Sequence, residues 1–194
     1  MTIFSMYFKL GVTHITDLVG YDHILFIMVL CAAYSLTQWR NLLILITAFT
    51  IGHCTTLVLA INNYLTIRAE IIEFLIPVTI LLTAIANILQ KDELVKQKHQ
   101  LFNYLMAMFF GLIHGLGFSN YLRSLLGSES NLVKPLFAFN LGIELGQLII
   151  VAIIILITAV TVYFGHVKKR EWNLILSGAG LGVSLILIIE RYPF

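Results

Sequence analysis

Long apolar runs cover almost the whole 194-residue chain and leave few folds open to it. A helix needs about 20 mostly apolar residues to cross the hydrocarbon core of a bilayer. The runs are too long, and too uniformly apolar, for the alternating strands of a membrane barrel. The sequence therefore predicts an all-α fold, a polytopic membrane bundle of about six transmembrane helices. The expected helices lie near residues 20–36, 41–61, 70–90, 101–119, 136–164 and 172–189.

The composition agrees with a membrane protein. Charged residues make up 11% of the chain, against about a quarter in a soluble domain, and the mean hydropathy is +0.94. The formal net charge of +2 offers no basic surface for nucleic acid. The two cysteines, Cys31 and Cys54, fall on different expected helices and form no disulfide framework. Because the connections are short and polar, we expect a single membrane domain over residues 1–194, with the lipid bilayer as its main partner.

The N-terminal segment and the basic residues predict a topology. Residues 1–12 are too short to span and lack the features of a secretory signal, so we expect a short interfacial or re-entrant helix in the mature protein. Six crossings place both termini on one side of the membrane. Loops on the opposite side hold seven of the 12 basic residues, and the positive-inside rule then places both termini outside the cytoplasm. These seven residues are Arg40, Lys91, Lys96, Lys98, Lys168, Lys169 and Arg170.

Several ionisable side chains fall inside the expected helices, the first of which can extend back to about His14 if the chain stays helical through Gly20. Such a group near the centre of the bilayer costs about 2.5–3.5 kcal/mol on insertion scales, so it is usually paired and functional. When each helix is followed through the expected topology, all of these groups lie in the outer half of the bundle. We therefore predict that one outer pocket collects them. The set comprises His14, Asp17, Asp22, His23, His53, Glu73, His114 and Glu144, with Asn140 one turn before Glu144.

Imidazole and carboxylate groups together are ligands for a divalent transition metal, and imidazole suits nickel, zinc, copper and iron. The alternative is that the same groups hydrogen-bond one another and lock the bundle together. No HExxH or CxxC spacing is present, so the prediction of a metal rests on the convergence of several helices. The expected site residues are His14, His23, His53, His114, Asp22, Asn140 and Glu144.

The spacing of His14 and His23 argues for a broken helix. Residues nine apart point in opposite directions on a straight helix. Because Gly11 and Gly20 flank the His14 segment, we expect a break at Gly20. Whether His14 and His23 then share one site is left open by the sequence.

The carboxylates can be ranked by their expected depth. Glu144 lies about two turns inside its helix, where it stays ionised only beside a cation or strong donors. Asp22 diverges by about 100° from its neighbour His23, so we expect it to orient an imidazole of another helix. Glu73 lies near the outer interface, where water solvates it. The sequence thus ranks Glu144 and Asp22 above Glu73.

Pairs of glycines four residues apart let membrane helices approach closely. Three such pairs predict tight packing around the pocket, and plain helix packing is a sufficient explanation for them. The pairs are Gly111 and Gly115, Gly142 and Gly146, and Gly178 and Gly182.

Four motifs resemble those of the HupE/UreJ membrane proteins: GYDHILF (20–26), TAFTIGHCTTL (47–57), FGLIHGLGF (110–118) and FNLGIELGQ (139–147). Members of this family are described as hydrogenase or urease accessory proteins and nickel permeases. The resemblance implies a polytopic protein of the bacterial inner membrane, nickel as the metal, and hydrogenase or urease maturation proteins as partners. Cys54 stands where the family often has Ser, and Pro77 interrupts the segment after Glu73. The matching motif residues are Asp22, His23, His53, His114, Asn140 and Glu144.

Three functions are compatible with the sequence. A permease conducts its ion through both leaflets, yet the inner half offers only weak polar groups such as Thr83 and Asn87. A pocket open only outward suits ion capture, and it equally suits a zinc-dependent intramembrane hydrolase of a lipid or lipid-like substrate. In such an enzyme the metal would activate water, with Glu144 or Asp22 as general base. A structural chaperone of a membrane complex would bind no metal.

Overall fold

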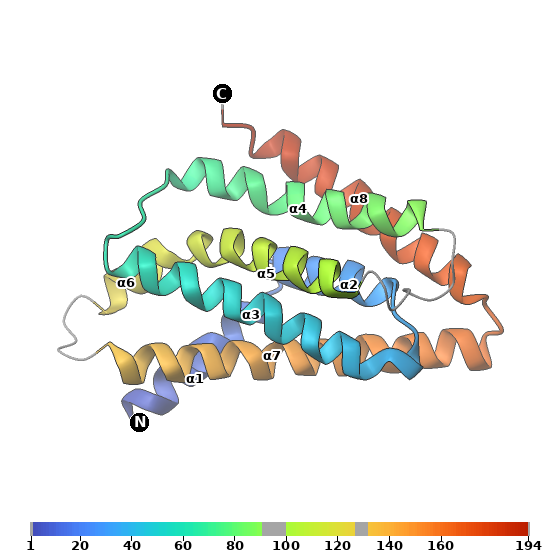
Figure 1. Cartoon of the computed structure of the whole chain (residues 1–194), viewed down its shortest axis with the longest axis horizontal. Helices are drawn as coiled ribbons and strands as arrows, with labels where there is room; N and C mark the ends of the chain where they lie inside the picture. The colour runs from blue at the N-terminus through green and yellow to red at the C-terminus, as the bar shows by residue number, and fades with distance from the viewer. Residues whose placement is uncertain (1, 91–99, 127–131, 194) are drawn as a thin grey trace.

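The computed structural model describes residues 2–90, 100–126 and 132–193, and within these ranges the regular structure is entirely helical. The helices run side by side along the long axis of the molecule (Figure 1). A 3-10 turn at Leu36–Gln38 precedes α3, and a π-helical turn at Val160–Phe164 follows α7. The all-α prediction is confirmed. The α-helices are α1 (Ile3–Ile15), α2 (Asp22–Ala32), α3 (Trp39–Ile61), α4 (Ala69–Leu89), α5 (Gln100–Gly117), α6 (Ser119–Leu126), α7 (Val133–Ala159) and α8 (Lys169–Glu190).

Four of these helical segments are long and apolar enough to cross a membrane. They are Leu36–Ile61, Ala69–Leu89, Val133–Phe164 and Lys169–Glu190. Helices α5 and α6, bent by 52° at their junction, supply a fifth if the pair is taken as one span. The predicted crossing at 20–36 differs, because it contains only the 11 residues of α2. At about 1.5 Å per residue α2 extends for roughly 17 Å, about half of a hydrocarbon core.

The expected break before α2 is present and extends from residue 16 to residue 21. The hydroxyl of Thr16 donates to the carbonyl of Val12 at 2.9 Å and closes the last turn of α1. The backbone N–H of Val19 donates to Asp17 Oδ1 at 2.9 Å, which stabilises the turn that follows. Asp22 then lies in the first turn of α2, where the helix dipole favours a carboxylate. The break therefore separates two short helices that each carry a histidine.

Helix α1 packs along α7 rather than standing apart from the bundle (Figure 1). A Cβ built on Gly11 would overlap the carbonyl oxygen of Phe139, and one built on Gly142 would overlap that of Phe8. Since only glycine permits such a backbone approach, the two helices are held in one register. The short N-terminal helix expected from the sequence is thus part of the packed structure.

Helices α3 and α5 approach each other in the same way. A Cβ on Gly52 would overlap the carbonyl oxygen of Met108, and one on Gly111 would overlap that of Phe49. The predicted pairs at 111/115 and 142/146 therefore lie at helix contacts. The third pair does not, because a Cβ on Gly178 or Gly182 would have no atom within 4 Å among the described residues. On α8 the close contact is made by Gly180 instead, against the side chain of Val29.

The helices form three extensively packed pairs: α1 with α7, α3 with α5, and α4 with α8. Helix α2 lies among them and contacts α4, α7 and α8. Both termini lie in the left half of Figure 1. Three of the seven basic residues behind the predicted orientation, Lys91, Lys96 and Lys98, lie outside the described residues, so the extracytoplasmic location of the termini stays a prediction.

Candidate metal centre

Three histidines from three helices meet inside the bundle. His14 comes from the last turn of α1, His23 from the first turn of α2 and His53 from α3. Each offers one ring nitrogen, and these three atoms all lie within 4.8 Å of one another. The ring centroids are 4.7 Å apart for His14 and His23, and 6.0 Å apart for each of the other two pairs. The break between α1 and α2 thus allows His14 and His23 to face a common point.

The imidazoles of this cluster do not hydrogen-bond one another. His14 Nε2, His23 Nε2 and both ring nitrogens of His53 are buried and have no hydrogen-bond partner in the described part of the chain. A buried polar atom without a partner costs about 1–3 kcal/mol. Locking of the bundle by hydrogen bonds between these rings therefore does not explain the cluster. Free lone pairs at this separation are suited to a divalent transition metal.

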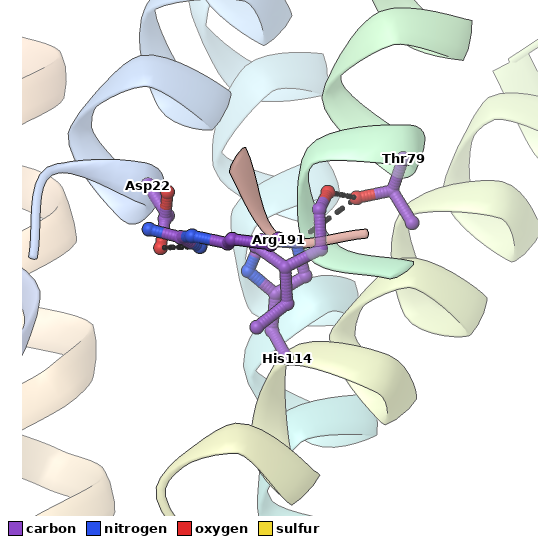
Figure 2. Close-up of polar contacts among 5 residues, drawn as sticks. Asp22, Thr79, His114 and Arg191 are labelled. Atoms are coloured by element: carbon purple, nitrogen blue, oxygen red, sulfur yellow. Dashed lines mark hydrogen bonds and ion pairs between the residues drawn. The ribbon is translucent and has the colours of Figure 1, made fainter. Parts of the chain in front are cut away.

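His114 of α5 lies beside the cluster, with its ring centroid 5.3 Å from that of His23. Its Nε2 atom lies 3.0 Å from the hydroxyl of Thr79 on α4. Its Nδ1 atom is buried and unpartnered. Figure 2 shows the contact with Thr79 on one side of the ring and the second nitrogen on the other side. A fourth imidazole thus borders the same region.

Asp22 is paired with a cation from the far end of the chain. Its Oδ2 atom accepts from Arg191 Nη1 at 2.9 Å, just beyond the end of α8 (Figure 2). The side chains of Arg191 and Asp22 are 27% and 13% exposed, so the pair is largely shielded from solvent. The other carboxylate oxygen, Oδ1, is buried and has no partner among the described residues.

A cavity of about 320 Å³ joins the imidazoles to these charged groups. Three carboxylates and one guanidinium share its wall with three histidines. This excess of negative charge would attract a cation to the imidazoles. The titratable and charged lining residues are His14, His23, His114, Asp17, Asp22, Glu73 and Arg191.

Glu144 and Asn140, which the sequence also assigned to the site, have other neighbours. Glu144 Oε1 accepts from the hydroxyl of Thr47 on α3 at 2.8 Å. One turn further along α7, Gln147 Oε1 accepts from the hydroxyl of Thr50 at 2.7 Å. The amide of Asn140 donates to the backbone of its own helix, and its Oδ1 atom is buried without a partner. None of the three lines the cavity bordered by His14, His23 and His114, and His53 does not line that cavity either.

Aromatic rings surround the imidazoles. Phe118 lies over His14 with a centroid distance of 3.9 Å, and it stacks on Phe139 at 5.3 Å. Phe26 and Phe49 each lie 5.1 Å from the ring of His114. These rings exclude water from one side of the cluster and hold the imidazoles in place. The sequence did not single them out for this role, because an aromatic residue in a membrane helix is more often core or lipid-facing.

The profile of the HupE/UreJ proteins matches residues 1–190, which include every residue of the cavity wall except Arg191. The chain belongs to the HupE/UreJ family. No curated protein and no solved structure shows significant similarity to it. Family membership and the apolar helices together identify an integral membrane protein. This HupE/UreJ protein is thereby connected with metal transport or with an accessory role in metal handling, and its histidine cluster is chemically suited to that role.

Proposed function

We propose that this HupE/UreJ protein binds a divalent transition metal through His14, His23 and His53 and acts as a membrane permease for that metal. The observation that carries the proposal is the approach of three ring nitrogens to within 4.8 Å of one another, from three helices. Their lone pairs have no competing hydrogen bonds within the described residues. The family favours nickel, and imidazole also suits zinc.

The surrounding groups have separate parts in this proposal. Asp17, Asp22 and Glu73 line the cavity and draw a dication toward the imidazoles. His114, whose ring lies beside the cluster and whose Nδ1 atom has no partner among the described residues, is the fourth ligand of this proposal on the α5 side. Arg191 forms an ion pair with Asp22 and so offsets the charge of this carboxylate while no metal ion is near. A location in the bacterial inner membrane and work alongside hydrogenase or urease maturation proteins follow from the family and belong to the same proposal.

The test combines metal content with transport. Purified protein is loaded with nickel or zinc, passed through a desalting column and analysed by mass spectrometry. The same protein is placed in liposomes that enclose a metal-responsive dye. We expect bound metal and dye response for the wild type, and loss of both for His53→Ala.

His166→Asn is the matched control, because His166 lies in the exposed turn before α8 and outside the cluster. Its backbone φ of 53° is one that asparagine tolerates. The proposal fails if the wild type retains no metal, or if His53→Ala and His166→Asn behave alike. Metal binding without any dye response would leave the site intact and reject the permease.

One observation favours a second candidate, the zinc-dependent hydrolase of a lipid or lipid-like substrate. An apolar cavity of about 250 Å³ lies between α2, α4 and α5, and Phe26 and Phe110 line it. Phe26 also packs against the ring of His114, so this cavity adjoins the histidine cluster. An acyl chain in the cavity would bring its head group toward the histidines, which would hold the zinc that activates water. Asp22 would be the general base, because it lines the cavity of the histidines and Glu144 does not. Release of fatty acid from the same liposomes, lost in His53→Ala, would support this candidate.

A further inference from the structure

Thr79 is the only hydrogen-bond partner that the structure gives to the ring of His114 among the described residues. It lies on α4, two residues after Pro77, and its side chain is buried at 2% exposure. Its Oγ1 atom is 2.7 Å from the carbonyl oxygen of Ile76 and 3.0 Å from His114 Nε2. Figure 2 shows the contact between Thr79 and the ring of His114.

The number of available protons decides which atom donates in each of the two contacts of the Thr79 hydroxyl. A carbonyl oxygen only accepts, and a hydroxyl has a single proton. Thr79 therefore donates to Ile76, and its oxygen accepts from His114 Nε2–H. A neutral imidazole carries one N–H, so the lone pair of His114 lies on Nδ1. Nδ1 is the atom that is buried without a partner in the described structure.

The opposite tautomer fits the contacts poorly. If Thr79 donated to Nε2, its oxygen and the Ile76 carbonyl would face each other at 2.7 Å without a proton between them. His114 would then carry its proton on Nδ1, where no described residue accepts it. The first change sets the lone pairs of two oxygens against each other, and the second leaves a buried N–H without an acceptor among the described residues; each is costly in an apolar interior.

We propose that Thr79 is a positioning residue that holds His114 in the Nε2–H tautomer and so presents the Nδ1 lone pair to the metal. This inference rests on the proposed function, because it concerns a ligand of the same site. Metal-bound histidines usually donate their other ring N–H to a nearby acceptor, which fixes the tautomer and the orientation of the ring. Here a threonine on a neighbouring helix supplies that acceptor. The side of His114 away from α4 is thereby selected as the binding side.

Thr83 provides a matched control on the same helix. Its hydroxyl also donates to a backbone carbonyl one turn back, that of Thr79, at 2.8 Å, and it has no hydrogen bond to a histidine ring of the described residues. Thr83→Val removes a hydroxyl of the same kind without touching His114. Thr79→Val removes the acceptor of the ring N–H, whereas Thr79→Ser keeps it.

The experiment reads the tautomer and the affinity separately. Full-length protein labelled with ¹⁵N-histidine is examined by NMR in detergent, and the His114 signals are assigned by their loss in His114→Gln. Each protein is then titrated with nickel chloride and with zinc chloride. We expect the Nε2–H form of His114 in the wild type, in Thr79→Ser and in Thr83→Val, and a mixture of tautomers in Thr79→Val. Metal affinity should fall roughly 10- to 100-fold in Thr79→Val, the usual effect of losing an outer partner of a ligand, and should return in Thr79→Ser.

Two results would overturn the inference. One is an Nδ1–H tautomer of His114 in the wild type, even if that protein binds metal. The other is a Thr79→Val protein that matches Thr83→Val in both the NMR signals and the affinity. If the wild type binds neither metal, the proposed function fails, and the NMR signals alone then decide whether Thr79 fixes the tautomer. Should Thr79→Val not fold, the comparison of wild type with Thr79→Ser and Thr83→Val still reports the tautomer.

Discussion

Replacement of Gly111 by alanine should destabilise the protein and disturb the site together. The new Cβ would overlap the carbonyl oxygen of Phe49 and press on the backbone nitrogen of His53, and a backbone atom cannot rotate away. Overpacking of this kind costs about 1–3 kcal/mol, and more where relief is difficult. Against this cost, alanine stabilises the interior of a helix by about 0.8–1.0 kcal/mol relative to glycine. Because the obstacle is a backbone oxygen, we take the cost of overpacking from the upper part of its range and expect a net loss of about 1–2 kcal/mol, or roughly a 5- to 30-fold change in the folded-to-unfolded ratio.

Gly178→Ala separates this steric effect from the propensity effect. A Cβ at that position on α8 meets no described atom within 4 Å, so only the favourable propensity remains. Unfolding in detergent mixtures of increasing SDS content, followed by circular dichroism, would give the stability of each variant. We expect Gly111→Ala to unfold earlier than the wild type and Gly178→Ala to unfold at the same point or later. Equal stability of the two variants would refute the argument that α3 and α5 meet backbone to backbone.

The charged groups and the metal give three further predictions. Glu73→Gln should weaken metal binding by roughly tenfold, about 1.4 kcal/mol, and more than Glu144→Gln, because only Glu73 lines the cavity; titration of both variants checks the order. Arg191→Gln should tighten binding several-fold at low ionic strength and less at 0.15 M salt, since it removes a cation 2.9 Å from Asp22; an unchanged affinity would contradict this. Removal of metal by a chelator should lower the unfolding temperature of the wild type but not of His53→Ala, as measured by thermal scanning.

Most of the helical architecture could be predicted because the thickness of a bilayer sets the length of each apolar run. Helix α4, expected at 70–90, is Ala69–Leu89, and α8, expected at 172–189, is Lys169–Glu190. The apolar run at 20–36 was expected to form one crossing helix, but α2 ends at Ala32, because apolar composition alone does not show where a helix ends. There the chain turns at Ser35, whose backbone N–H bonds to the side chain of Gln38 at 3.2 Å, and a separate helical segment begins.

The histidines were predictable for a related reason, since ionisable groups in a bilayer are expensive and tend to meet. The order of the carboxylates was harder, because depth along a helix does not give the direction of a side chain around it. Gly142 and Gly146 turn toward α1 and the segment of His14. Glu144, two residues from each, lies about 200° away around the helix and bonds to Thr47 on α3. The positions of the two glycines in the sequence indicate that Glu144 points away from α1, whereas the ranking considered only the depth of Glu144 along its helix.

Nothing in the sequence indicated that Arg191 and Thr79 belong to the site. Arg191 follows the end of α8, 169 residues from its partner Asp22, and nothing local connects the two. Threonine is common in membrane helices, where its hydroxyl usually bonds to the preceding turn. Thr79 does this as well, and its second contact exists only because α4 and α5 are neighbours.

The four histidines lie on two of the three packed helix pairs and on α2. His14 belongs to the pair α1 and α7, His53 and His114 belong to the pair α3 and α5, and His23 stands on α2 between them. A metal ion bonded to all four histidines would cross-link the pair α1 and α7, the pair α3 and α5, and helix α2. The contacts between these units are less extensive than those within each pair. By mass action, free metal at a hundred times its dissociation constant would favour the joined arrangement by about 2.7 kcal/mol. Sliding of one pair past another would draw one ligand away from the rest and weaken the hold on the ion. Metal binding and the relative position of the helix pairs would thus be thermodynamically linked. A carrier needs such a link to bind its ion on one side of the membrane and release it on the other.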